Sequence, residues 1–101
     1  MTAVTLDAAG EGRWLLTGDL DFATVPQAWT LLRPLLERSG RVTLSLEKVG
    51  RANSAALGLL LEGLAHARAN GCELRLQSLP QGLLDLAQVS NIEHLIGASR
   101  A

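Results

Sequence analysis

The sequence predicts an α/β domain with a small four-stranded sheet, mixed but mostly parallel, and three helices. Segments with the two-residue period of a strand alternate along the chain with segments of helical period. The connections between them are short, and the first two strands have the pattern of a hairpin. Because 101 residues leave room for only one hydrophobic core, we expect residues 1–101 to form a single domain.

Two short strands open the chain. Val4 and Leu6 mark the first, and the run from Trp14 to Leu16 marks the second. Gly10-Glu11-Gly12 lies between them and is rich in turn-forming residues, so we expect the two strands to pair antiparallel.

The first helix is expected to begin near Val25. Thr24, followed three positions later by Gln27, forms a capping-box pattern, and Pro26 stands in the first turn, where its missing N–H does no harm. Pro34 predicts a kink or an early end of the regular helix. The apolar stripe of this helix, which ends at Ser39-Gly40, consists of Val25, Ala28, Trp29, Leu32 and Leu36.

The middle of the chain predicts a strand, a loop and a long helix. Apolar and polar residues alternate from Arg41 to Leu46, which indicates a strand, and a loop from Glu47 to Asn53 is expected to follow. The second helix should run from Ser54 to Asn70, with Gly71 as a left-handed stop.

One more strand and one more helix are predicted after Gly71. The segment from Cys72 to Gln77 alternates apolar and polar residues, which is typical of a strand with one wetted face or of an edge strand. Pro80 then opens a third helix with an expected end at Ser90-Asn91, and Ile92 to Ile96 are expected to form a short closing element. The apolar side of this third helix carries Leu83, Leu86 and Ala87.

The composition excludes several classes of protein. Hydrophobic residues make up 48% and charged residues 19%, which excludes a disordered chain, and three aromatic residues leave Leu, Val and Ala to fill the core. Nine basic and ten acidic residues give a net charge of −1 and are scattered along the chain, so we expect no nucleic-acid partner.

Cysteine content and hydropathy bear on the compartment. Cys72 is the single cysteine, which excludes an internal disulfide and a cysteine metal site, and we expect its thiol to be buried. The N-terminus lacks a signal-peptide pattern, and the longest apolar run, Ala55 to Leu61, is far shorter than the ~20 residues that span a bilayer. We therefore expect a soluble, cytoplasmic protein without direct membrane insertion.

The candidate site is centred on Ser54, where the strand period changes to the helical period. A helix N-terminus presents unpaired N–H groups and partial positive charge, which suits a polar or anionic group. Ser54 is either part of the helix cap or, if Asn53 supplies the capping oxygen, free to face a partner. Ala55, Ala56 and Gly58 allow a close approach either to the sheet or to the backbone of a partner.

Charged residues are expected near Ser54, both in the loop that precedes it and at the end of the second strand. Arg51 and Lys48 precede Ser54, and each is either an ordinary surface charge or a partner contact, with Arg51 the better candidate for contact. Asp19 and Asp21 end the second strand beside the same loop, where they serve either binding or local hydrogen bonding.

The sequence contains no pattern for catalysis or for a cofactor. Ser54 and His66 lie three helical turns apart, roughly 18 Å by the 1.5 Å rise per residue, which excludes a nucleophile and its base. Neither His66 nor His94 has ligands at a known metal spacing, and Glu62 with His66 is expected to form a solvated i,i+4 contact. With phosphate-binding glycine loops also absent, we expect no enzymatic activity, no cofactor and no metal.

Two motifs, in this order of elements, resemble the STAS domain family. Gly18-Asp19-Leu20-Asp21 resembles the Gly-Glu-Leu-Asp of that family, and residues 53–58, Asn-Ser-Ala-Ala-Leu-Gly, resemble its Asp-Ser-Ser-Gly-Leu-Gly segment. Residues 21–29, Asp-Phe-Ala-Thr-Val-Pro-Gln-Ala-Trp, are more particularly similar to the MlaB branch, the cytoplasmic STAS subunit of the Mla phospholipid ABC transport system. The resemblance covers nearly the whole chain and implies the STAS fold.

The resemblance implies a non-enzymatic adaptor that binds and regulates the transporter ATPase subunit, at the inner face of the inner membrane through that partner. The resemblance implies that Ser54 lies in or near the contact, and we expect Arg51, Asn53, Ala55 and Gly58 to bind the partner with it. The alternative is an anti-sigma-factor antagonist, in which an anti-sigma factor that is also a kinase phosphorylates the serine. Asn53 replaces the usual family Asp, which weakens the phosphorylation hypothesis more than the docking hypothesis.

Overall fold

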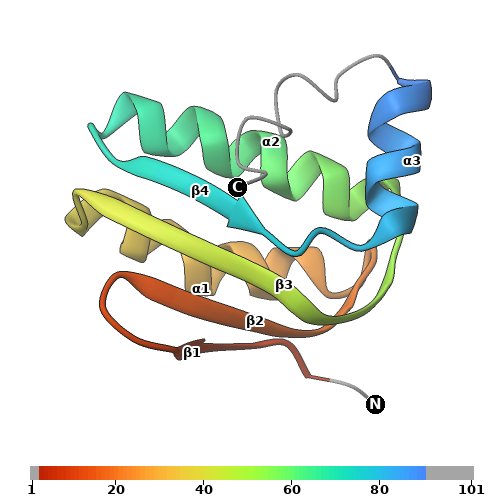
Figure 1. Cartoon of the computed structure of the whole chain (residues 1–101), viewed down its shortest axis with the longest axis horizontal. Helices are drawn as coiled ribbons and strands as arrows, with labels where there is room; N and C mark the ends of the chain where they lie inside the picture. Colours follow the sequence, from red (N-terminus) through yellow and green to blue (C-terminus); the bar gives the residue numbers. More distant parts are fainter. Residues whose placement is uncertain (1–2, 91–101) are drawn as a thin grey trace.

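The computed structural model describes residues 3–90, and this part of the chain contains the four strands and three helices that the sequence predicts (Figure 1). Asn91, the expected closing element from Ile92 to Ile96, and His94 lie outside the described residues. In chain order the elements are β1 (Thr5–Ala8), β2 (Arg13–Leu20), α1 (Val25–Arg38), β3 (Arg41–Ala52), α2 (Ser54–Ala69), β4 (Glu73–Gln77) and α3 (Gln81–Val89).

The strands form a mixed sheet in the order β1-β2-β3-β4. β1 pairs antiparallel with β2, and β2 with β3 and β3 with β4 pair parallel. The expected hairpin and the mostly parallel sheet are therefore confirmed, and β4 lies at an edge, as its alternating pattern allows.

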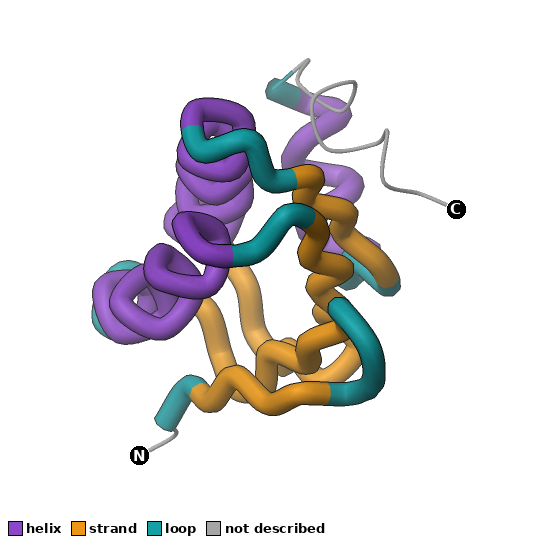
Figure 2. Tube along the Cα trace, turned by 90° about the vertical axis from the view of Figure 1, so that its left-hand side faces the viewer, coloured by secondary structure: helices purple, strands orange, loops and turns teal. Residues whose placement is uncertain are grey.

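One face of the sheet is covered by α1 and α2, which Figure 2 shows side by side against the strands. The core between these layers is aliphatic, as the composition predicts. The fully buried side chains on the strands include Leu16, Leu44, Leu46 and Leu76, and those on the two helices include Leu32, Leu36 and Leu60.

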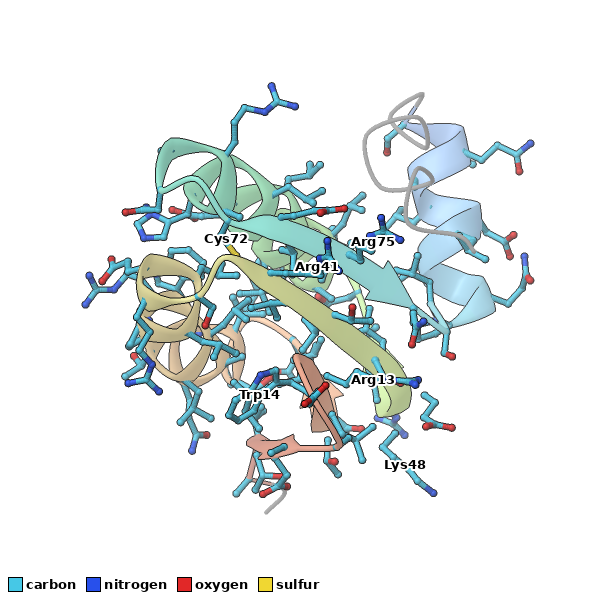
Figure 3. The ribbon with its side chains drawn as sticks, turned by 60° about the vertical axis from the view of Figure 1, so that its left-hand side comes forward. Arg13, Trp14, Arg41, Lys48, Cys72 and Arg75 are labelled. Atoms are coloured by element: carbon cyan, nitrogen blue, oxygen red, sulfur yellow. The ribbon has the colours of Figure 1, made fainter. Side chains whose placement is uncertain are left out.

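The opposite face of the sheet is polar, and Arg13, Arg41 and Arg75 are exposed on it (Figure 3). Glu73 pairs with both Arg75, at 2.8 Å, and Arg41, at 3.5 Å. These exposed pairs contribute little to stability, but they put charge on the edge strand, which discourages pairing with another chain.

The structure corrects the predicted end of β3. We expected a loop from Glu47 to Asn53, but β3 continues to Ala52 and stays paired with β2, with Thr17 opposite Lys48 and Leu20 opposite Ala52. The pairing shifts register twice between Leu15 and Leu20 of β2. Such an irregularity inserts extra residues and breaks the two-residue period, so the sequence pattern no longer indicates a strand.

Two features considered for α1 are absent: an early end at Pro34 and the capping box. The helix runs through Pro34 to Arg38, so it does not end early. Buried residues on both sides of Pro34, Leu32 and Leu35, hold this segment against the core, and their packing outweighs the lost hydrogen bond. Thr24 is the N-cap residue but makes no side-chain cap bond, so the capping box is absent as well.

The second helix and its exit follow the prediction. Asn70 is the C-cap residue of α2, and Gly71 has a positive φ of 70°, which favours glycine. Cys72 is buried, with 6% of its surface exposed, and burial together with the neighbouring Glu73 raises the pKa of its thiol.

His66 makes a different contact from the one expected. Its Nε2 atom lies 2.8 Å from Oε2 of Glu37 on α1, in place of a contact with Glu62, and the Trp29 ring packs edge-on against it with ring centroids 5.3 Å apart. Arg33 also pairs with Glu37, at 3.2 Å. The packing of α1 on α2 brings Glu37 and His66 together across 29 residues of sequence.

We predict that Glu37→Gln reduces the loss of stability in acid. The hydrogen bond from His66 holds the pKa of Glu37 below its usual value, and the charge of Arg33 acts in the same direction. The Glu37 carboxylate therefore stabilises the fold above its unfolded-state pKa of about 4.3, and this stabilisation disappears as the pH falls through its folded-state pKa. Urea unfolding between pH 5 and pH 3 should show a larger loss for the wild-type chain than for Glu37→Gln.

The matched control for this prediction is Glu62→Gln. Glu62 is an exposed acid on α2 that makes no ion pair within residues 3–90. Its replacement should leave the acid-induced loss of stability as in the wild-type chain. An identical loss in Glu37→Gln and in the wild-type chain would contradict the role of the Glu37–His66 contact.

Candidate functional site

The candidate site lies where the carboxyl ends of β2 and β3 meet. Leu20 is opposite Ala52, and the Asn53 N–H donates to the Leu20 carbonyl at 3.3 Å. The turn from β2 to α1 and the turn from β3 to α2 therefore leave the sheet side by side. A surface pocket of about 400 Å³ lies between them, lined by Leu20, Asp21, Arg51, Ala52 and Asn53.

Asn53, not Ser54, caps α2. The Asn53 side-chain oxygen accepts a hydrogen bond from the Ala55 N–H at 2.8 Å, and its backbone is extended, as at an ordinary N-cap. Ser54 is the first helical residue and is exposed. Within the described part of the chain its hydroxyl makes no hydrogen bond, so of the two roles considered for Ser54 the structure leaves the outward-facing one.

The small residues that follow Ser54 divide between the core and the surface. Ala56 is fully buried and allows α2 to approach the sheet. Gly58 is exposed, and a Cβ atom added to it would meet nothing within 4 Å. The packing of the described residues therefore does not require a glycine at position 58. Ala55, between them, is half-buried.

Asp19 ties β2 to β3. Its Oδ1 atom accepts a hydrogen bond from the Arg51 N–H at 2.8 Å, and the same oxygen lies where a Cβ on Gly50 would sit. The observed bond joins residues 32 positions apart, so Asp19 makes a hydrogen bond between strands and not the local one considered for it. Its carboxylate fixes the last residues of β3 just before the helix begins.

Asp21 organises the turn into α1. Its Oδ1 atom accepts from the Ala23 N–H at 2.8 Å and from the Thr24 N–H at 3.0 Å. The Thr24 hydroxyl, in turn, donates to the Asp19 carbonyl at 2.7 Å and accepts from the Asp21 N–H at 2.9 Å. This explains the missing capping box, because the Thr24 hydroxyl binds the end of β2 and Asp21 binds the N–H groups at the helix start.

The site is mixed in charge, with the exposed Arg51 and a helix start next to the Asp19 and Asp21 carboxylates. Arg51 is exposed at the pocket and makes no ion pair with residues 3–90. The first turn of α2 contains no acidic residue to offset the unpaired N–H groups of the helix start. Lys48 is exposed three positions before Arg51 on β3 (Figure 3). Arg51 and the start of α2 favour a single carboxylate or phosphate placed next to them, whereas Asp19 and Asp21 oppose a broad anionic surface.

Sequence analysis did not identify Phe22 as a site residue. Phe22 lies in the turn between Asp21 and Thr24, and 72% of its surface is exposed. The sequence pattern that could have singled out Phe22 is an aromatic residue in a turn, outside the apolar pattern of both neighbouring elements.

No cluster of three or more His, Cys, Asp or Glu residues that could hold a metal ion occurs in the described part of the chain. Ser54 and His66 lie in the first and fourth turns of α2, as the sequence implies. Among residues 3–90, no helix has both the length and the apolar character required to cross a membrane.

Comparisons with known proteins agree with this architecture. A family model described as "Mlab, STAS domain" matches residues 4–97. A solved structure of the anti-sigma factor antagonist SpoIIAA in its unphosphorylated form has a similar fold, with a TM-score of 0.72. That match covers 98% of this chain and 86% of the other at 16% sequence identity, so it bears on the fold alone. No curated protein matches the sequence. The fold class implied by the two sequence motifs is confirmed.

We predict that Asp19→Ala destabilises the chain by about 0.5–1.5 kcal/mol, the usual net contribution of one hydrogen bond, because water can reach the exposed donor. The amide of Arg51, which loses its acceptor, should exchange its hydrogen faster. Asp19→Asn, which keeps an acceptor oxygen, should cost less. Urea unfolding and amide hydrogen exchange measure the two effects.

Asp7→Ala is the control, because Asp7 is an exposed carboxylate on β1 without a hydrogen bond or ion pair to the described residues. It should leave both measurements nearly unchanged. Equal destabilisation by the two alanine variants would show that Asp19 does not join the strands.

Proposed function

We propose that this chain, which belongs to the MlaB-type STAS domain family, is a non-enzymatic adaptor that binds and regulates the ATPase subunit of an Mla-type phospholipid ABC transporter. STAS domains are protein-interaction modules, and the family match carries the choice of partner. In this proposal the adaptor acts in the cytoplasm, at the inner face of the inner membrane through its partner. It needs no cofactor.

The observation that supports docking at Ser54 is its exposure beside a helix cap made by another residue. Asn53 already satisfies the Ala55 N–H, so contact with Ser54 does not cost the helix its cap. Gly58 is exposed one turn further along α2 and therefore lies on the same side of the helix. The small side chains of Ser54 and Ala55 and the absence of one at Gly58 allow the backbone of a partner to pack closely against this side of the helix.

Positive charge at the edge of this surface comes from Arg51 and from the start of α2. Arg51 and the start of α2 together favour an acidic group on the partner, and such complementarity fixes orientation and raises the rate of association. Asp19 and Asp21 do not compete for Arg51, because Asp19 binds the Arg51 backbone and Asp21 binds the turn. We therefore assign Arg51, Asn53, Ser54, Ala55 and Gly58 to the docking surface, with Asp19 and Asp21 as its supports.

The second candidate function is an anti-sigma-factor antagonist regulated by phosphorylation of Ser54. The exposed hydroxyl favours it, and the similar fold of SpoIIAA, described as an anti-sigma factor antagonist in its unphosphorylated form, is compatible with it. A phosphate would add about −1.5 to −2 charges at the start of α2, which the fold tolerates. Intact-mass measurement after incubation with an anti-sigma factor kinase and ATP distinguishes this function from docking alone.

We predict that Ser54→Glu weakens binding of the transporter ATPase by about tenfold or more, because the larger, charged side chain occupies the contact. A carboxylate at the first helical position interacts favourably with the helix dipole, so the fold should not lose stability. Calorimetric titration with the purified ATPase subunit measures the affinity, and thermal unfolding measures the stability.

Ala69→Glu places the same side chain at an exposed position at the far end of α2 and should leave the affinity unchanged. Ser54→Ala, which adds no bulk, should also bind. Unaltered binding by Ser54→Glu would refute docking at this site.

We predict opposite effects of Gly58→Ala on stability and binding. Nothing described in the chain opposes the added methyl group, and alanine favours a helix over glycine, so the free energy of unfolding should rise by up to about 1 kcal/mol. The same methyl group should separate the two backbones and weaken binding of the ATPase. Gly82→Ala, at an exposed helical glycine of α3 with equally open surroundings, should not weaken binding. Full affinity in Gly58→Ala would show that no partner backbone approaches here.

A further inference from the structure

Phe22 is exposed on a turn that is held in one conformation. Of the apolar side chains in the described residues, it is the only aromatic one with a largely exposed surface, at 72%. The turn is fixed by the Asp21 and Thr24 side chains, which make hydrogen bonds of 2.7 to 3.0 Å on either side of Phe22. An aromatic ring that is displayed rigidly loses little conformational freedom when a partner covers it.

The pairing of β2 with β3 places Phe22 beside the docking surface. Phe22 follows Leu20 by two residues, Ser54 follows Ala52 by two, and Leu20 lies opposite Ala52. The pocket of about 400 Å³ between the two turns is lined by Asp21, next to Phe22, and by Asn53, next to Ser54. Phe22 and Ser54 therefore belong to one continuous surface, although 32 residues separate them in sequence.

Arg51 is, like Phe22, an exposed side chain at this surface that forms no contact on which the described part of the chain depends. It lines the same pocket, is exposed, and forms no ion pair with the described residues. Arg33, Arg41 and Arg75 pair with acids, and of the cations in residues 3–90 without an ion pair Arg51 is the one that lines this pocket. Aromatic residues and arginine are enriched where single side chains carry most of the binding energy of an interface.

We infer that Phe22 is the anchor residue of the docking surface: its ring inserts into an apolar pocket of the partner protein, and Arg51 pairs with a carboxylate at the rim of that pocket. The partner is the ATPase subunit, so this inference rests on the proposed function. It extends the docking surface from the start of α2 to the turn between β2 and α1.

The charge around Phe22 favours a protein over an anionic membrane surface. Asp19 and Asp21 lie within three residues of Phe22, so this surface is mixed in charge: Arg51 can pair with one carboxylate placed directly on it, but the surface as a whole does not attract an extended layer of lipid phosphates. The whole chain carries a formal charge of −1, whereas attachment to anionic lipids relies on clusters of several Lys and Arg residues. A single ring beside a single guanidinium fits one apolar pocket with one carboxylate.

The first experiment titrates the transporter ATPase subunit with the wild-type chain, Phe22→Ala, Phe22→Leu and Val89→Ala. Phe22→Ala should raise the Kd by about 30-fold or more, as expected for a residue that dominates an interface, and Phe22→Leu should recover part of the affinity. Val89→Ala truncates an equally exposed apolar side chain on α3, 85% exposed, and should bind like the wild-type chain. Thermal unfolding should be unchanged in all variants, because both side chains are exposed.

The second experiment measures Kd against salt concentration for Arg51→Ala and Arg68→Ala. An Arg51–carboxylate pair predicts weaker binding by Arg51→Ala and a smaller dependence of its Kd on salt than in the wild-type chain. Arg68 is an exposed arginine at the far end of α2, without an ion pair to the described residues, and its removal should change neither quantity.

The outcomes separate this inference from the proposed function. If the wild-type chain binds the ATPase and Ser54→Glu weakens binding, but Phe22→Ala binds no more weakly than Val89→Ala, the anchor role is wrong and the proposed function stands. If the wild-type chain does not bind the ATPase, both are overturned. A large loss in Phe22→Ala with partial recovery in Phe22→Leu supports the anchor role.

Discussion

The junction of β2 with β3 at their carboxyl ends is the constraint on which the candidate site depends. Leu20 lies opposite Ala52, the Asn53 N–H reaches the Leu20 carbonyl, and the Asp19 carboxylate binds the Arg51 N–H. The register shifts in this pair, so a side chain supplies a bond that a regular parallel ladder would form between backbones. Because the junction is fixed, two turns from distant parts of the chain form one surface.

The composition of that surface follows from which polar groups the fold uses. Asp19, Asp21, Thr24 and Asn53 are all engaged with backbone groups and hold the two turns in place. The Ser54 hydroxyl, the Arg51 guanidinium and the Phe22 ring have no such role among the described residues. A rigid set of supports around unused hydrogen-bonding, charged and apolar groups suits the proposed docking surface, because preorganisation lowers the cost of binding.

Local patterns predicted most of the fold. Alternation and helical period located each described strand and helix, and the Asn53 cap and the Gly71 stop follow from the chemistry of those residues. In each prediction that was wrong, a tertiary contact overrides the local sequence pattern. The loop expected from Glu47 to Asn53 is strand because β2 pairs with it, and α1 continues through Pro34 because buried leucines hold it. The Thr24 hydroxyl binds the end of β2 in place of its own helix.

The sequence by itself determined the class of the fold, the aliphatic character of the core and the position of Ser54 at a helix start. Each of these is a property of neighbouring residues and of their period. Only the tertiary structure decided that Asp19 binds the Arg51 N–H, that His66 meets Glu37, and that the turn containing Phe22 leaves the sheet next to the turn that leads to Ser54. Those relations join residues 29 to 32 positions apart, and the period of a helix or strand carries no information over such a distance. The pairing of the strands and the packing of the helices bring them together.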